Sequence, residues 1–312
     1  MDGVELYLGD CLESLRQMPD ASVNCCVTSP PYFGLRDYGE PGQLGLEPTP
    51  DEFVKALVAV FLEVRRVLAN DGTFWLNLGD SYARSPAKGG SGPSGKNRDY
   101  YGNNYGNARG AEVPEGLKPK DLIGIPWRVA FALQADGWYL RQDIIWSKPN
   151  PMPESVSDRC TKSHEYIFLL SKSPRYYFDS ESVKEPVAAS SVARLSQSGL
   201  VNQAGSDRVP GKTNGPMRAV GNGETRNRRS VWSVTTKPFK GAHFATFPPD
   251  LIEPCILAGC PVGGTVLDPF GGSGTTAGVA LKLGRKAVLC ELNAEYAALM
   301  GERIIKICEV TK

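Results

Sequence analysis

The C-terminal part of the sequence constrains the fold most strongly. Residues 264–307 read GTVLDPFGGSGTTAGVALKLGRKAVLCELNAEYAALMGERIIKI. The pattern predicts a strand, a glycine-rich turn, a helix, a second strand and a final helix. Strands joined through such a crossover helix are parallel, and they need helices on the faces of their sheet. We therefore expect an α/β protein.

The rest of the chain repeats this alternation of strands and helices. The run at 23–28 is too continuously apolar to have a solvated face, and apolar residues at three- and four-residue steps over 51–68 predict an amphipathic helix. The predicted strands are 4–9, 23–28, 73–80, 138–148 and 164–172, and the predicted helices are 11–18, 51–68, 125–135 and 250–260. The helix at 51–68 is expected to stop at the Asn70-Asp71-Gly72 turn.

Two long segments lack any core-forming period. Residues 84–120 carry seven Lys or Arg against three acids, and residues 181–240 carry ten against four. Both are rich in Gly, Ser and Asn, so we expect the first to be a mobile loop. The whole chain has a net charge of only +1, so two basic segments lie within an acidic remainder. This distribution favours contact with a polyanion.

Several classes of protein do not fit the composition. No stretch approaches the roughly 18 uncharged apolar residues of a membrane span, and the N-terminus MDGVELYLGD lacks the basic and apolar regions of a leader. Eight cysteines occur without a CxxC and with only two histidines, so we expect no metal site. Most of these cysteines lie in apolar runs, which favours a reducing cytoplasm.

The glycine-rich turn predicts a nucleotide-type site. In VLDPFGGSGTT the backbone can approach a ligand closely at the start of a helix. The turn lacks the lysine of a P-loop and matches a dinucleotide fingerprint imperfectly, so on its own it is equally consistent with a structural turn. Glu291, however, ends the following strand, where an acid can bind both ribose hydroxyls.

A second motif, Ser29-Pro30-Pro31-Tyr32, follows the predicted strand at 23–28. Consecutive prolines fix φ near −65° and cannot donate hydrogen bonds, so the Ser29 and Pro30 carbonyls become a stiff row of acceptors. They lie at the carboxyl end of a strand, where open α/β sheets bind ligands. Such a site suits an amino group, and Tyr32 beside it can stack on a base removed from its duplex.

Together the two motifs resemble those of the amino-group DNA methyltransferases that use S-adenosylmethionine. The family signatures are Asp, Asn or Ser followed by Pro-Pro-Tyr or Pro-Pro-Phe, and a DPFxGxGTT loop; residues 29–32 and 268–276 match them. The order of the motifs resembles the circularly permuted beta group. The resemblance implies a Rossmann-like methyltransferase fold with a mostly parallel seven-stranded sheet, an antiparallel edge hairpin at 138–148 and 164–172, and an inserted recognition region.

The resemblance also implies the domain organisation. Residues 1–180 would form the catalytic half, residues 181–240 the target recognition region, and residues 241–312 the cofactor-binding half. Double-stranded DNA is the implied partner, S-adenosylmethionine the cofactor and a homodimer the assembly.

Site residues are carried over by position in the matching motifs. The catalytic set is Ser29, Pro30, Pro31 and Tyr32. The cofactor-binding set is Asp10, Phe247, Asp268, Pro269, Phe270, Gly271, Gly272, Ser273, Gly274, Thr275 and Glu291. A basic cluster, Arg226, Arg228 and Arg229, is the candidate DNA contact.

The sequence leaves alternatives open for the base that is methylated and for the class of enzyme. Ser at position 29 favours cytosine N4 over adenine N6 within the family, with exceptions. Carbon-5 cytosine methylation would need a cysteine nucleophile, and Cys255 in the only Pro-Cys pair is expected to be a core residue. A nicotinamide oxidoreductase would leave the Pro-Pro-Tyr motif and the basic segments unexplained. Ribosomal RNA or protein glutamine methylation and a catalytically inactive DNA-binding module also stay open.

Overall fold

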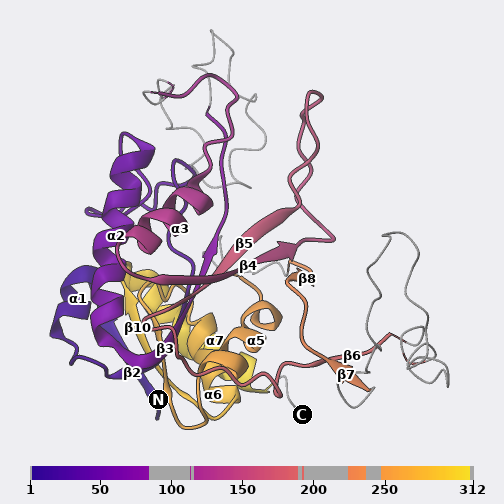
Figure 1. Cartoon of the computed structure of the whole chain (residues 1–312). Coiled ribbons are helices and arrows are strands. Elements are labelled where there is room, and N and C mark those ends of the chain that lie inside the picture. The colour runs from indigo at the N-terminus through magenta and orange to yellow at the C-terminus, as the bar shows by residue number, and fades with distance from the viewer. Residues whose placement is uncertain are drawn as a thin grey trace. The chain divides into compact units, whose positions relative to one another are not determined.

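The structure is a computed structural model that describes residues 2–83, 113, 116–188, 192, 224–236 and 247–309 (Figure 1). The chain divides into two compact units. The larger contains Met1–Phe178 and Ser230–Lys312, and the smaller contains Asp179–Arg229. No helix in the described residues is long and apolar enough to cross a membrane.

In its described residues the larger unit is built on a mixed sheet of eight strands. In sheet order these are β1 (Val4–Leu8), β10 (Lys286–Glu291), β9 (Thr265–Asp268), β2 (Val23–Thr28), β3 (Leu68–Leu78), β5 (His164–Ser171), β4 (Tyr139–Ser147) and β8 (Val231–Ser233). β5 runs antiparallel to both of its neighbours, whereas every other pairing is parallel.

The expectation of seven strands with the hairpin at the edge is therefore wrong. The antiparallel hairpin of β4 and β5 forms where predicted, but β8 pairs with β4 on its outer side through Ile145↔Val231 and Trp146↔Trp232. A strand of three residues is too short to show a side-chain period in the sequence. β8 forms because its backbone pairs with β4, so side-chain alternation does not predict it.

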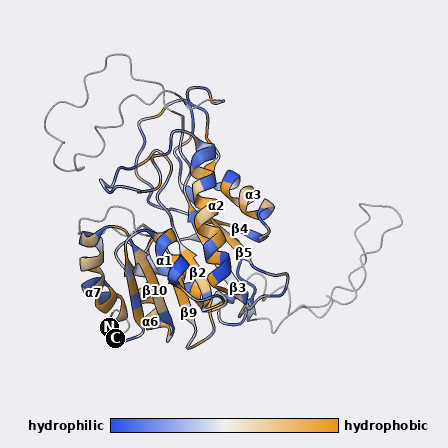
Figure 2. Ribbon diagram, turned by 90° about the vertical axis from the view of Figure 1, so that its left-hand side faces the viewer, coloured by the Kyte–Doolittle hydropathy of each residue, from blue (hydrophilic) through white to orange (hydrophobic). Residues whose placement is uncertain are grey.

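Among the described residues of the larger unit, six helices cover this sheet. They are α1 (Cys11–Gln17), α2 (Pro50–Val67), α3 (Ile125–Ala135), α5 (Pro249–Gly259), α6 (Thr275–Lys282) and α7 (Ala294–Glu309). The buried face of α2 packs on the sheet, with the Phe61 ring 4.8 Å from the Phe74 ring of β3. Figure 2 shows the hydrophobic colour concentrated in the strands that these helices cover.

Helix α2 ends within one residue of its predicted end, but β3 begins at Leu68, well before the predicted strand at 73–80. The helix stops at Val67, and Leu68 already has extended backbone and begins β3. Leu68 is fully buried, and packing of its side chain in the core favours extended backbone before the Asn70-Asp71-Gly72 turn. That turn lies in an irregular part of β3, where the pairing with β2 passes from Val23↔Leu68 to Cys25↔Thr73.

The smaller unit contains a short antiparallel pair, β6 (Glu185–Pro186) and β7 (Thr225–Arg226). Residues 230–236, which the predicted recognition region included, belong to the larger unit through β8. Residues 84–112, 114–115, 189–191, 193–223 and 237–246 lie outside the described residues, and with them most of the two predicted basic segments.

Candidate active site

One cavity of about 890 Å³ lies at the carboxyl ends of the parallel strands. Ser29, Pro30, Pro31 and Tyr32, which follow β2, form one part of its wall. Asp10, Phe247, Pro269, Phe270, Gly272 and Glu291 form another. The two motifs, more than 200 residues apart in the sequence, therefore share a single cavity.

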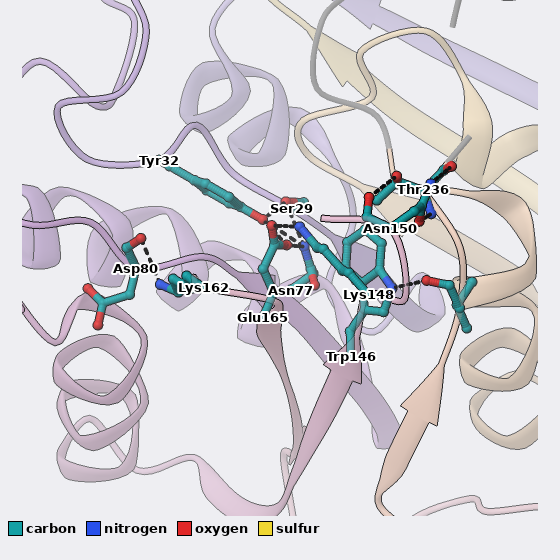
Figure 3. Close-up of polar contacts among 11 residues, drawn as sticks. Ser29, Tyr32, Asn77, Asp80, Trp146, Lys148, Asn150, Lys162, Glu165 and Thr236 are labelled. Atoms are coloured by element: carbon teal, nitrogen blue, oxygen red, sulfur yellow. Dashed lines mark hydrogen bonds and ion pairs between the residues drawn. The ribbon is translucent and has the colours of Figure 1, made fainter. Parts of the chain in front are cut away.

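Tyr32 is held inside this cavity by its hydroxyl group (Figure 3). The hydroxyl donates to Glu165 Oε2 over 2.7 Å and accepts from Asn77 Nδ2 over 2.8 Å. Burial, and next the negative charge of Glu165, raise the Tyr32 pKa well above its ordinary value, so the phenol stays protonated at neutral pH. It is therefore available as a hydrogen-bond donor.

The ring of Tyr32 is confined as closely as its hydroxyl. A Cβ atom at Gly79 would lie 2.5 Å from Tyr32 Cε2, so only glycine leaves room for the ring at that point. On the backbone side, a Cβ at Gly45 would lie 3.1 Å from the Tyr32 carbonyl oxygen, and Gly45 has a φ of +101°. The position of Tyr32 therefore depends on two glycines outside its own motif.

Ser29 is held more loosely than Tyr32. Its hydroxyl lies 3.4 Å from the Tyr32 oxygen and 3.3 Å from Asn77 Nδ2, both long for hydrogen bonds to a hydroxyl. Its lone pairs therefore retain capacity for another donor. Pro30, beside it in the cavity wall, has a carbonyl oxygen and no N–H.

Three residues outside the predicted catalytic set complete this part of the cavity. They are Asn77 at the end of β3, Lys148 just after β4 and Glu165 at the start of β5. Lys148 forms an ion pair with Glu165 Oε1, and its ammonium lies 4.2 Å from the centre of the Trp146 ring. The strand order, which the sequence does not reveal, brings these residues to Ser29 and Tyr32.

The other end of the cavity is formed by acids and glycines at β1 and β10. Glu291 Oε2 accepts from Gly272 N over 2.7 Å, and its Oε1 accepts from Asn293 N over 2.9 Å. Burial raises the Glu291 pKa, which these backbone hydrogen bonds oppose. Asp10 caps α1 through a 2.9 Å bond from Glu13 N and lines the same end.

The shape of this end suits a ligand that approaches the backbone. Gly9 has a φ of +133°, and an added Cβ there would meet no atom within 4 Å because it would project into open space. The loop that follows Tyr32 covers part of the site, since Asn293 Nδ2 donates to Glu40 Oε1 over 2.9 Å. The Tyr38 and Tyr296 rings meet edge to face beside this contact, 6.5 Å apart.

Asp268 does not line the cavity. It is buried, and its carboxylate accepts from Thr28 Oγ1 over 2.6 Å, from Thr276 Oγ1 over 2.6 Å and from Phe270 N over 3.1 Å. Burial raises its pKa to about 6, and the same hydrogen bonds oppose that rise. In this structure the carboxylate ties the end of β2 to the glycine-rich turn.

The remaining members of the predicted cofactor set belong to the glycine-rich turn and the start of α6. Gly271, Ser273, Gly274 and Thr275 do not line the cavity. A Cβ at Gly271 would lie 3.1 Å from Leu289 Cβ, so glycine permits the close packing of the turn on β10. Gly274, with a φ of +81°, precedes α6.

The candidate DNA-binding arginines lie in the smaller unit. Arg226 Nε and Arg229 Nε both bind Glu185 Oε1, over 2.8 and 2.6 Å.

Cys255 is fully buried in α5 and does not line the cavity, in keeping with a core residue. The described residues contain no group of three or more His, Cys, Asp or Glu side chains that could hold a metal ion.

The sequence matches a family model and several Type II methyltransferases. Residues 23–302 match the DNA methylase family. The chain is 49% identical over 304 residues to the Type II methyltransferase M.Cfr9I of Citrobacter freundii, covering 97% of this chain and 88% of that protein. It is 46% identical to the Type II methyltransferase M.SmaI of Serratia marcescens, covering 97% and 91%.

Two solved structures share the fold at low sequence identity. PvuII DNA methyltransferase, described as cytosine-N4-specific, is similar with a TM-score of 0.63 and 20% identity, covering 99% of this chain and 92% of that one. The DNA modification methylase TTHA0409 of Thermus thermophilus, solved with S-adenosyl-L-methionine, is similar with a TM-score of 0.60 and 22% identity, covering 98% and 94%.

Proposed function

This chain belongs to the DNA methylase family, and we propose that it methylates an exocyclic amino group of a base in duplex DNA, with cytosine N4 favoured. It is a DNA methyltransferase whose methyl donor is S-adenosylmethionine. The observation that carries the proposal is the single cavity shared by Ser29-Pro30-Pro31-Tyr32 and the glycine-rich turn.

The reacting amine is a poor nucleophile because its lone pair is delocalised into the ring of the base. In the proposed mechanism the Pro30 carbonyl oxygen and the Ser29 hydroxyl oxygen accept hydrogen bonds from the two N–H groups of this amine. Both acceptors line the cavity, and Ser29 makes only long contacts within the protein. Holding both hydrogens favours a pyramidal nitrogen and orients its lone pair, which combines electrostatic preorganisation with positioning. Tyr32 stacks on the base, which must leave the duplex to enter the cavity.

The end of the cavity at β1 and β10 fits the cofactor. Glu291 would accept hydrogen bonds from the ribose hydroxyls, and Asp10 would contact the adenine amino group. Pro269, Phe270 and Gly272 would lie against the methionine part, together with Phe247. Bound there, S-adenosylmethionine supplies an electrophilic methyl group on a sulfonium. Asp268 contributes by holding the turn rather than by contact with the ligand.

The preference for cytosine rests on Ser29, because Ser at this position accompanies N4 methylation in the family more often than Asp does. Adenine N6 is the alternative within the same mechanism, since the hydroxyl can accept from either amine.

The motif order supports a circularly permuted beta-group arrangement. We assign target recognition to residues 181–240, with Arg226, Arg228 and Arg229 as DNA contacts. A homodimer is the proposed assembly, and sedimentation at working concentration would reveal a monomer if this is wrong.

The proposal is tested by expressing the chain in a bacterial host that lacks DNA methylation. Single-molecule sequencing of the host DNA then reports whether a base is modified, which base it is and in what sequence context. We expect modified cytosine N4 at one short sequence, and no modification with the Ser29→Ala, Pro31→Ala double variant. If the purified wild-type protein binds S-adenosylmethionine but leaves host DNA unmodified, the proposal is wrong.

A further inference from the structure

A chain of hydrogen-bond donors ends at the carboxylate of Glu165 (Figure 3). Ser29 Oγ lies 3.4 Å from the Tyr32 hydroxyl, to which it donates, and that hydroxyl donates to Glu165 Oε2 over 2.7 Å. Asn77 Nδ2 donates to the same Oε2 over 3.0 Å. An ionised carboxylate only accepts, so Glu165 determines the direction in which the Tyr32 proton points.

Lys148 balances the charge of Glu165 within the cavity wall. The side chains of Glu165 and Lys148 are 13% and 18% exposed, and Lys148 Nζ pairs with Oε1, the oxygen that Tyr32 does not use. Burying a carboxylate without a partner is costly, whereas a paired and hydrogen-bonded one is tolerated. Because Lys148 pairs with Oε1, Oε2 accepts the hydrogen bonds from the Tyr32 hydroxyl and Asn77 Nδ2.

The direction of these bonds matters at Ser29. With the Tyr32 proton committed to Glu165, the Tyr32 oxygen can accept, and the Ser29 proton is directed toward it. Ser29 Oγ then acts as an acceptor: Asn77 Nδ2 lies 3.3 Å from it, and its remaining lone pair is available to a donor in the cavity. Were the Tyr32 proton reversed toward Ser29, the Ser29 proton would have to point into the cavity and would oppose the N–H of an incoming amine.

We propose that Glu165 is a positioning residue that, through the Tyr32 hydroxyl, makes Ser29 a hydrogen-bond acceptor and thereby fits the cavity to substrates that donate an amino group. This inference rests on the proposed function. The Asn77 amide reinforces the same direction, because its Nδ2 donates to both Tyr32 and Glu165. Within the described part of the chain, Asn77 Oδ1 has no hydrogen-bond partner, so the amide's contacts here are made by donation.

The test is a double-mutant cycle with Glu165→Gln and Tyr32→Phe. Each single variant should lower kcat about ten- to hundredfold, as expected for loss of a hydrogen bond to a charged group. KM for S-adenosylmethionine should stay unchanged, because neither side chain lies at the cofactor end. Glu165→Gln makes position 165 a donor as well as an acceptor, and Tyr32→Phe removes the hydroxyl, so both substitutions remove the same fixed proton direction. The double variant should therefore be no slower than the slower single variant.

Glu253→Gln is the matched control. Glu253 is also a partly buried glutamate paired with a lysine, Lys282, at 3.3 Å, but it does not line the cavity. This control should keep the wild-type kcat. Thermal melting of every variant reports on folding separately from activity.

The outcomes distinguish this inference from the proposed function. If the wild-type protein transfers no methyl group to DNA, the proposed function fails. If the wild type is active and Glu165→Gln keeps full kcat, or if the two substitutions multiply their effects, Glu165 does not act through Tyr32. Should Glu165→Gln not fold, Tyr32→Phe still decides the matter, because full kcat without the hydroxyl contradicts the inference.

Discussion

The buried carboxyl group of Asp268 should make the stability of this protein depend on pH in an unusual direction. Its pKa is raised from 3.8 to about 6 by burial. In the unfolded chain the group ionises near its ordinary value, whereas in the folded protein it holds its proton up to about pH 6. The stability it contributes is therefore fully present below about pH 4 and is lost as pH rises through about 6.

The magnitude follows from the difference between the two pKa values. Each pKa unit corresponds to about 1.4 kcal/mol, so the contribution of Asp268 changes by about 3 kcal/mol across the whole interval. About 2 kcal/mol of this change lies between about pH 4.5 and 7, where denaturation is practicable. Asp268→Asn removes the titration and keeps the size of the side chain.

The assay is urea denaturation of the wild type and Asp268→Asn across that pH range. The free energy of unfolding of Asp268→Asn minus that of the wild type should rise with pH by about 2 kcal/mol. Hydrogen bonds lost from Thr28 and Thr276 shift this difference by a constant and leave its slope unchanged. Asp143→Asn, at an exposed aspartate of β4, is the control for a change in charge alone. A flat or falling difference for Asp268→Asn would refute the reasoning.

Two further predictions concern the two ends of the cavity. Gly79→Ala should displace the Tyr32 ring, because the new methyl would lie 2.5 Å from Cε2; single-turnover methyl transfer should slow at least tenfold, with unchanged S-adenosylmethionine affinity in calorimetry. Wild-type transfer rates would contradict this placement. Glu291→Gln should weaken S-adenosylmethionine binding about tenfold or more in the same calorimetric assay, because the site loses a charged acceptor. Unchanged affinity would place the ribose elsewhere.

The sequence predicts strands better than it predicts which side chains meet. The strands predicted at 23–28, 138–148 and 164–172 are found at Val23–Thr28, Tyr139–Ser147 and His164–Ser171. Glu165 and Asn77 become neighbours of Ser29 only through the order β2-β3-β5 and the register Leu78↔Tyr166. That order depends on tertiary pairing, which a single sequence does not encode in any local period.

Asp268 and Glu291, two predicted cofactor ligands, have different surroundings in the structure. Both acids end neighbouring parallel strands, and both were predicted to bind the cofactor. The Glu291 carboxylate lines the cavity, whereas Asp268 faces two threonine hydroxyls and is only 2% exposed. The direction of a side chain at the end of a strand depends on where the pleat stops, and the sequence does not fix this to within one residue.

The contact between Thr28 and Asp268 gives the two motifs a common support. Thr28 immediately precedes Ser29, and Asp268 begins the glycine-rich turn, so their 2.6 Å hydrogen bond joins the two motifs where each leaves the sheet. β2 and β9 are already paired just before this point through Cys26↔Leu267. A methyl transfer requires donor and acceptor to be held within a few tenths of an ångström of their reactive arrangement, and mobile loops do not provide that precision. In this structure the pairing of β2 with β9 and the buried Asp268 carboxylate hold both loops on adjacent strands, and the proposed methyl transfer would use that support.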